Sequence, residues 1–120
     1  MRVILAVVLA MTATASAVMA DEIDDAHRQA ISSRDSYWNC LAQEYPLGGN
    51  KSMSDQDFTL HITSVCSSER QNFRASLVGF LSMKFPDVDA DAHMTTANNA
   101  IAFAQKDIVT AFIRKTVPKK

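Results

Sequence analysis

The chain has no surplus of positive charge and lacks the short motifs of common catalytic sites. Its 120 residues include 12 Lys and Arg and 13 Asp and Glu, and this balance argues against electrostatic binding of nucleic acid. It has no Gly-x-Ser-x-Gly turn for a serine nucleophile and no Cys-x-x-Cys-His motif for haem attachment. It also has no internal repeat, no low-complexity tract and no strand-like alternation. These absences favour a non-enzymatic helical protein.

The first twenty residues have the pattern of a secretory signal peptide. Arg2 precedes an uncharged run, 3–11, and small residues follow up to Ala20, as in a leader that is cut after that residue. A cut after Ala17 is the alternative, and an uncleaved anchor is a second one. We therefore expect a periplasmic or secreted protein that starts at Asp21 and is not stably inserted in a membrane.

The remaining segment, residues 21–120, has the length of one small domain. Arg2 is the only charged residue of the expected leader, residues 1–20. Residues 21–120 therefore contain 11 Lys and Arg and 13 Asp and Glu, and their net charge is −2. A domain of this size buries its core incompletely, so a covalent cross-link would contribute a large share of its stability.

Apolar residues recur at helical spacing in three segments, 21–45, 54–84 and 89–116. Ser54 starts the second segment with a sequence typical of a helix N-terminus, and Pro86 follows its end. Loops of about eight and about four residues separate the segments, and short loops favour antiparallel neighbours. We expect an all-α fold, a small antiparallel three-helix bundle with one disulfide between helices.

Cys40 and Cys66 each lie on the apolar stripe of a different expected helix. Because disulfides persist in exported proteins, we expect the two to pair; two buried free thiols are the alternative. The bond would set Cys40 level with Cys66 and place Glu69 about 5 Å from Arg34 along the helix axis. We therefore expect a partly buried ion pair between Arg34 and Glu69. Separate extension of the two side chains into water is the alternative.

Asp87, Asp89 and Asp91 alternate like the first ligands of a calcium-binding loop. Such a loop also needs a glycine and a glutamate where this chain has Ala92 and Asn98, so the three aspartates are weak metal candidates. The histidines fall on three different expected helices, without a ligand spacing on any one of them: His27, His61 and His93. We expect no cofactor and no catalytic residue.

Two stretches resemble the surroundings of the paired cysteines in the HdeA-type periplasmic acid-stress chaperones: Trp38-Asn39-Cys40 and residues 66–74. Those chaperones are small exported helical proteins with one disulfide between helices, so the resemblance implies the same compartment and an acid-stress holdase activity. The cysteines are closer in sequence here than in that family, and a further long helix follows. The chain also resembles short exported bacterial two-cysteine helical proteins of unknown function.

Surplus apolar residues lie off the main stripes of the second and third segments: Val78, Leu81, Phe85, Phe103, Val109 and Ile113. They either close the core between these helices or form a surface for a partner or a second copy. We expect an exported non-enzymatic protein that acts through contact with an unknown protein partner or by self-association. The alternatives are an acid-stress holdase chaperone and a small ligand-, Ca²⁺- or Zn²⁺-binding module.

Overall fold

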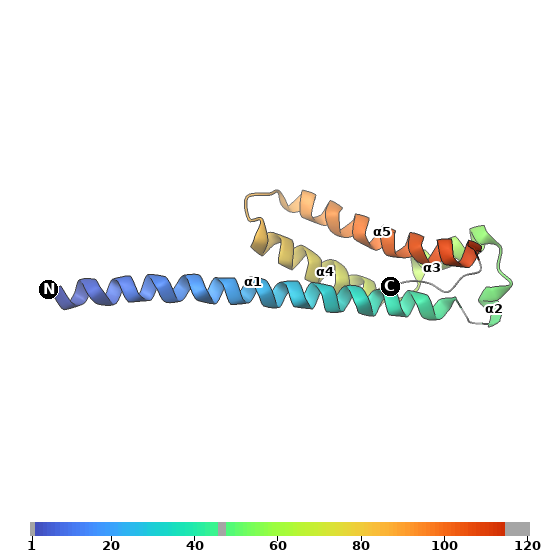
Figure 1. Ribbon diagram of the computed structural model, residues 1–120. Coiled ribbons are helices and arrows are strands. Elements are labelled where there is room, and N and C mark those ends of the chain that lie inside the picture. Colours follow the sequence, from blue (N-terminus) through green and yellow to red (C-terminus); the bar gives the residue numbers. More distant parts are fainter. Residues whose placement is uncertain (1, 46–47, 115–120) are drawn as a thin grey trace.

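The computed structural model describes residues 2–45 and 48–114, and the side chains of 18–45 and 49–114. Over these residues the chain is helical and has no strand, which confirms the all-α class. Its helices are α1 (Arg2–Glu44), α2 (Gly48–Lys51), α3 (Asp55–Ser64), α4 (Ser67–Lys84) and α5 (Ala90–Arg114) (Figure 1). The expected three-helix bundle is too simple, because the second segment forms two helices and the short α2 occupies the first loop.

Helix α1 starts at Arg2 and not at the expected residue 21. Figure 1 shows its N-terminal half extending beyond the other helices. Among the described side chains, the first that belongs to the buried core is Ala30, so a cut after Ala17 or Ala20 would leave the core intact. Over the described residues, no helix combines the length and apolar character of a membrane span. The leader and its cleavage stay a prediction.

Helix α4 runs antiparallel along the second half of α1. The ring of His27 on α1 lies 4.8 Å from that of Phe80 near the end of α4. Further along α1, the Ser33 hydroxyl lies 3.0 Å from the hydroxyl of Ser76, which comes earlier in α4. The contacts therefore move in opposite directions along the two helices, as antiparallel neighbours require.

Helix α5 returns parallel to α1 and meets it near the C-terminal ends of both. The indole Nε1 of Trp38 donates to Asp107 Oδ2 at 3.0 Å, and Tyr45 packs edge-on against Phe112. Phe112 also stacks on Phe58 of α3, with ring centroids 3.8 Å apart. The main buried cluster joins four helices: Tyr37, Leu41, Phe58, Ile62, Phe73, Ile101, Ala104, Ile108 and Phe112.

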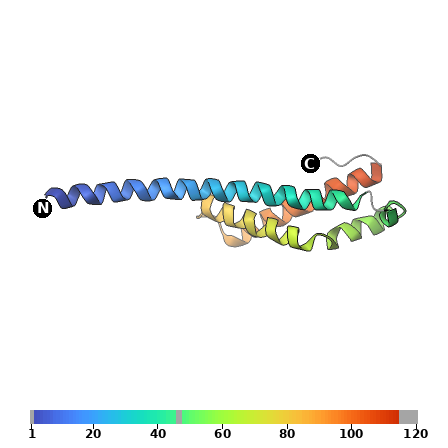
Figure 2. The ribbon, with the colours of Figure 1, turned by 90° about the horizontal axis from the view of Figure 1, so that it is seen from below.

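The expected single helix 54–84 is wrong, because the chain breaks at Val65 and Cys66. Ser54 caps α3 as expected, since its Oγ accepts a hydrogen bond from the Asp57 amide at 3.1 Å. Cys66 has a φ of 59° and a ψ of 41°, a left-handed conformation that costs a non-glycine residue about 1–2 kcal/mol. Figure 2 shows α3 and α4 following one another in line after this break. The break lets α3 pack on α5 while α4 packs on α1.

Side chains satisfy backbone groups that the helix ends expose. The Arg70 Nη1 donates to the carbonyl oxygens of Thr63 at 2.9 Å and Val65 at 3.2 Å, at the end of α3. At the end of α1, the buried Asn50 donates from Nδ2 to the Glu44 carbonyl at 2.9 Å. The last carbonyls of a helix have no partner within that helix, so Arg70 stabilises the end of α3 at the break and Asn50 stabilises the end of α1.

We predict that Phe58→Ala lowers the free energy of unfolding by about 3–5 kcal/mol, because it removes a buried ring from the centre of the core. Leu60→Ala on the same helix is the matched control, since Leu60 is 62% exposed and its loss should change stability by less than about 0.5 kcal/mol. Urea denaturation followed by circular dichroism measures both. Equal effects of the two substitutions would contradict the packing of α3.

Candidate functional site

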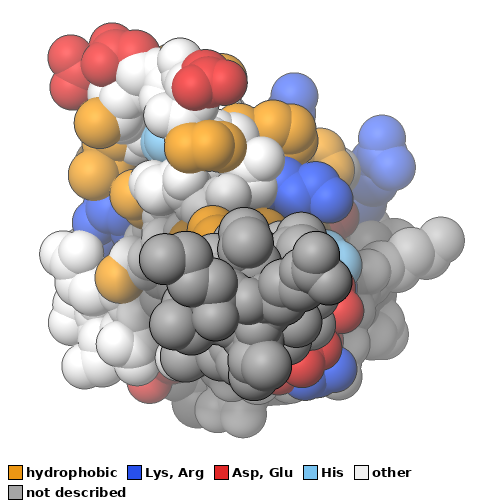
Figure 3. Space-filling model, turned by 90° about the vertical axis from the view of Figure 1, so that its left-hand side faces the viewer, with side chains coloured by type: hydrophobic (Ala, Val, Ile, Leu, Met, Phe, Trp, Pro, Cys, Tyr) orange, Lys and Arg blue, Asp and Glu red, His pale blue; other side chains and the backbone are white. Residues whose placement is uncertain are grey.

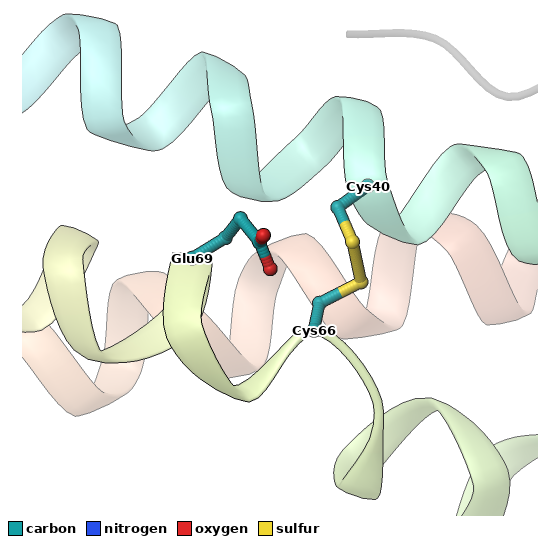
Figure 4. Close-up of side chains that lie close together, drawn as sticks. All are labelled: Cys40, Cys66 and Glu69. Carbon is teal, nitrogen blue, oxygen red and sulfur yellow. A yellow bond between two sulfur atoms is a disulfide. The ribbon is translucent and has the colours of Figure 1, made fainter.

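Cys40 and Cys66 form the expected disulfide, with Cα atoms 6.1 Å apart. The bond joins α1 to the residue that precedes α4, and the Glu69 side chain extends towards it from the first turn of α4 (Figure 4). All three residues are half-buried. The disulfide therefore holds two helices together at a position that solvent can still reach.

The expected ion pair between Arg34 and Glu69 is not formed. Arg34 pairs with its own neighbour, since its Nη2 lies 3.0 Å from Asp35 Oδ1, and Glu69 has no hydrogen bond or ion pair within the described part of the chain. The expectation assumed an unbroken helix through Cys66. The break makes Glu69 a first-turn residue of α4, where the helix dipole stabilises its carboxylate.

Asp87, Asp89 and Asp91 are exposed around the turn between α4 and α5. Figure 3 shows acidic side chains beside apolar ones at this end of the molecule. The three carboxylates are not among the described groups that converge closely enough to share a metal ion. Their position at the start of α5 fits a role as acidic residues at a helix N-terminus.

The three histidines have separate neighbours. His27 packs against a phenylalanine of α4, and His61 Nε2 lies 3.1 Å from Glu44 Oε1. His93 is buried, with its Nε2 3.1 Å from the Phe85 carbonyl oxygen. The histidines therefore support contacts within the fold and do not form one cluster.

A groove lies between α1 and α5, with α4 as its floor. Its wider part has a volume of about 590 Å³ and is lined by Arg34, Asp35, Trp38, Phe73, Ala100 and Phe103. A second part of about 240 Å³ shares some of these residues and adds His27, Ala30, Ile31, Leu77 and Phe80. We call the two parts together the α1–α5 groove. The small side chain of Ala100 lines both parts on the α5 side, and that of Ala30 lines the second part on the α1 side.

Aromatic side chains form one end of the α1–α5 groove. Phe103 is 64% exposed, and its ring meets Trp38 edge-on with centroids 5.8 Å apart. The bond from the indole to Asp107 holds Trp38 in place. The Arg34–Asp35 pair lies in the same wall, with both side chains about half exposed. The groove therefore offers apolar surface beside a hydrogen-bond donor and an acceptor.

No protein-family model, curated protein or solved structure matches this chain. The α1–α5 groove and the disulfide are therefore interpreted from their own geometry and chemistry.

We predict that Asp107→Ala makes the indole of Trp38 more mobile and more accessible to a soluble quencher, because it removes the acceptor for Nε1. Trp38 is the only tryptophan, so fluorescence quenching by acrylamide reports on this wall alone. The lost bond should also lower stability by about 1–2 kcal/mol. Asp24→Ala, at an exposed position of α1, is the control. Equal quenching in both variants would show that Asp107 does not position Trp38.

Proposed function

We propose that this chain is an exported, non-enzymatic helical protein that binds a protein partner, and that the α1–α5 groove receives an amphipathic helix of that partner. The observation that carries the proposal is the exposed aromatic wall formed by Phe103 and Trp38. Phe103 meets Trp38 edge-on but remains 64% exposed, so most of its ring stays available to a partner. Exposed apolar surface beside a groove is typical of a binding site.

The dimensions of the α1–α5 groove suit a short helix. From His27 to Trp38 its α1 wall extends about 16 Å, at about 1.5 Å for each helical residue. A bound helix of about three turns would place three or four apolar side chains along such a floor, at the i, i+3/i+4 and i+7 spacing of helix-in-groove recognition. Phe73 and Leu77 supply the apolar floor.

Polar groups at the edge of the groove also support binding of a partner helix there. Arg34 and Asp35 form a half-exposed pair beside the apolar floor, an arrangement that resembles the polar rim of a protein interface. A partner helix would present polar side chains to this rim. Charged rim residues contribute to orientation and to the rate of association more than to affinity.

The disulfide supports the proposed compartment. A cystine that links α1 to α4 persists in the periplasm or outside the cell, where thiols are oxidised. The proposal therefore places both the protein and its partner in a periplasmic or secreted setting.

Photo-crosslinking in the producing cells tests this function. We predict that a photoreactive phenylalanine analogue at position 103 gives a discrete adduct with a partner protein. The same analogue at position 60 is the matched control, because Leu60 is 62% exposed and Phe103 is 64% exposed, but only Phe103 lines the groove. A second substitution, Ala100→Glu, places a charge on the groove wall and should abolish the adduct.

Two outcomes would contradict the proposal. Equal yields of adduct from positions 103 and 60 would indicate non-specific crosslinking at exposed positions and no specific binding in the groove. An adduct with twice the mass of this chain would assign the groove to a second copy. Circular dichroism of Ala100→Glu verifies that the variant keeps its helices, so that loss of the adduct reports on binding.

A further inference from the structure

The disulfide and Glu69 form the one set of three potential metal ligands that the described residues bring together. The two sulfur atoms and a carboxylate oxygen of Glu69 all lie within 4.8 Å of one another. Figure 4 shows the carboxylate extending from α4 into the space beside the bond between Cys40 and Cys66. The cluster therefore joins ligands from two separate helices at one point.

Glu69 has no partner of its own. It makes no hydrogen bond or ion pair within the described part of the chain. The nearest cation in sequence, Arg70, is occupied elsewhere, because its guanidinium donates to the carbonyl oxygens of Thr63 and Val65. The carboxylate is thus free to accept a cation that arrives beside the sulfur atoms.

The spacing of the two cysteines suits a zinc ion as well as a disulfide. With Zn–S distances of about 2.3 Å, two thiolates on one tetrahedral ion lie roughly 3.8 Å apart. The Cα atoms of Cys40 and Cys66 are 6.1 Å apart, so rotation of the side chains is enough to separate the sulfur atoms to that distance. A carboxylate oxygen completes the third position at about 2.0–2.2 Å from the ion.

We propose that reduction of the Cys40–Cys66 disulfide creates a zinc-binding site with the two thiolates and the Glu69 carboxylate as ligands. Because thiols are oxidised in the proposed compartment, this step requires a thiol or dithiol reductant that acts on this bond there. The reductant supplies two electrons, the S–S bond breaks, and the reductant is oxidised to its own disulfide. Each cysteine then carries a thiol, and Zn²⁺ displaces both thiol protons to the solvent as it binds. A water molecule occupies the fourth position of the tetrahedron.

The position of Cys66 favours reduction of the disulfide and binding of Zn²⁺ to the resulting thiolates. Cys66 is the N-cap of α4, and a helix N-terminus stabilises a thiolate. All three ligand residues are half-buried and not sealed in the core, so both a reductant and an ion can reach them. Three negative groups at one point repel one another without a cation, and Zn²⁺ removes that repulsion while it restores the cross-link between α1 and α4.

Metal titration of the full chain tests the site. The protein is reduced with a phosphine, which is then removed without air, and Co²⁺ is added as a coloured probe before Zn²⁺. We expect one equivalent of Co²⁺ to give the intense near-ultraviolet absorption of thiolate ligands, and Zn²⁺ to abolish it. The oxidised protein should bind neither ion at this position. Zn²⁺ should also raise the thermal midpoint of the reduced protein by about 5 °C or more.

Glu69→Gln distinguishes the three-ligand site from simple capture by two thiols. We expect this variant to bind Zn²⁺ at least about tenfold more weakly in the reduced state, whereas Glu22→Gln, at an exposed position of α1, should match the unmodified chain. Unchanged affinity in Glu69→Gln, or no thiolate absorption with Co²⁺, would overturn the proposal. If the reduced chain loses its helices, recovery of helical circular dichroism on addition of Zn²⁺ supports the site, and failure to recover contradicts it.

Discussion

The structure depends on the covalent bond between Cys40 and Cys66. Cys66 is also the left-handed residue at the junction of α3 and α4. The φ of 59° at Cys66 is unfavourable for a residue with a side chain. The disulfide more than offsets this cost, because it removes the freedom of a loop that spans 26 residues of sequence. Arg70 contributes further by donating to the two carbonyl oxygens that the break exposes. The disulfide also fixes the register of α1 against α4.

That register concentrates the core towards the C-terminal ends of α1 and α5, and the groove begins at the edge of this core, at Trp38 and Phe73. Towards the C-terminal ends of α1 and α5, aromatic rings from several helices fill the interior, with Phe58 stacked on Phe112. From Trp38 towards the N-terminus of α1, the α1–α5 groove lies open between α1 and α5, and Ala30 and Ala100 are among its lining residues. The same helix pairing thus produces both a stable centre and a surface on which a partner can bind.

The helical class, the Ser54 cap and the disulfide could be predicted from the sequence, because each depends on local spacing or on the small number of cysteines. The break at Cys66 could not, since the apolar stripe continues through it at helical spacing. The cluster of Thr63, Ser64, Ser67 and Ser68 was the available signal, because such residues favour helix ends over helix interiors. The groove depends on contacts such as Trp38–Asp107, 69 residues apart, which no local pattern encodes.

The most direct test of the role of the disulfide compares two free energies of unfolding, that of the oxidised protein and that of a Cys40→Ser, Cys66→Ser double variant. Both are measured by urea denaturation in metal-free buffer. We expect the double variant to lose about 3–4 kcal/mol, the loop-closure entropy of a cross-link of this span. Reductant should lower the stability of the unmodified protein and leave that of the variant unchanged. A difference below about 1 kcal/mol would contradict the claim that the disulfide holds α1 and α4 in register.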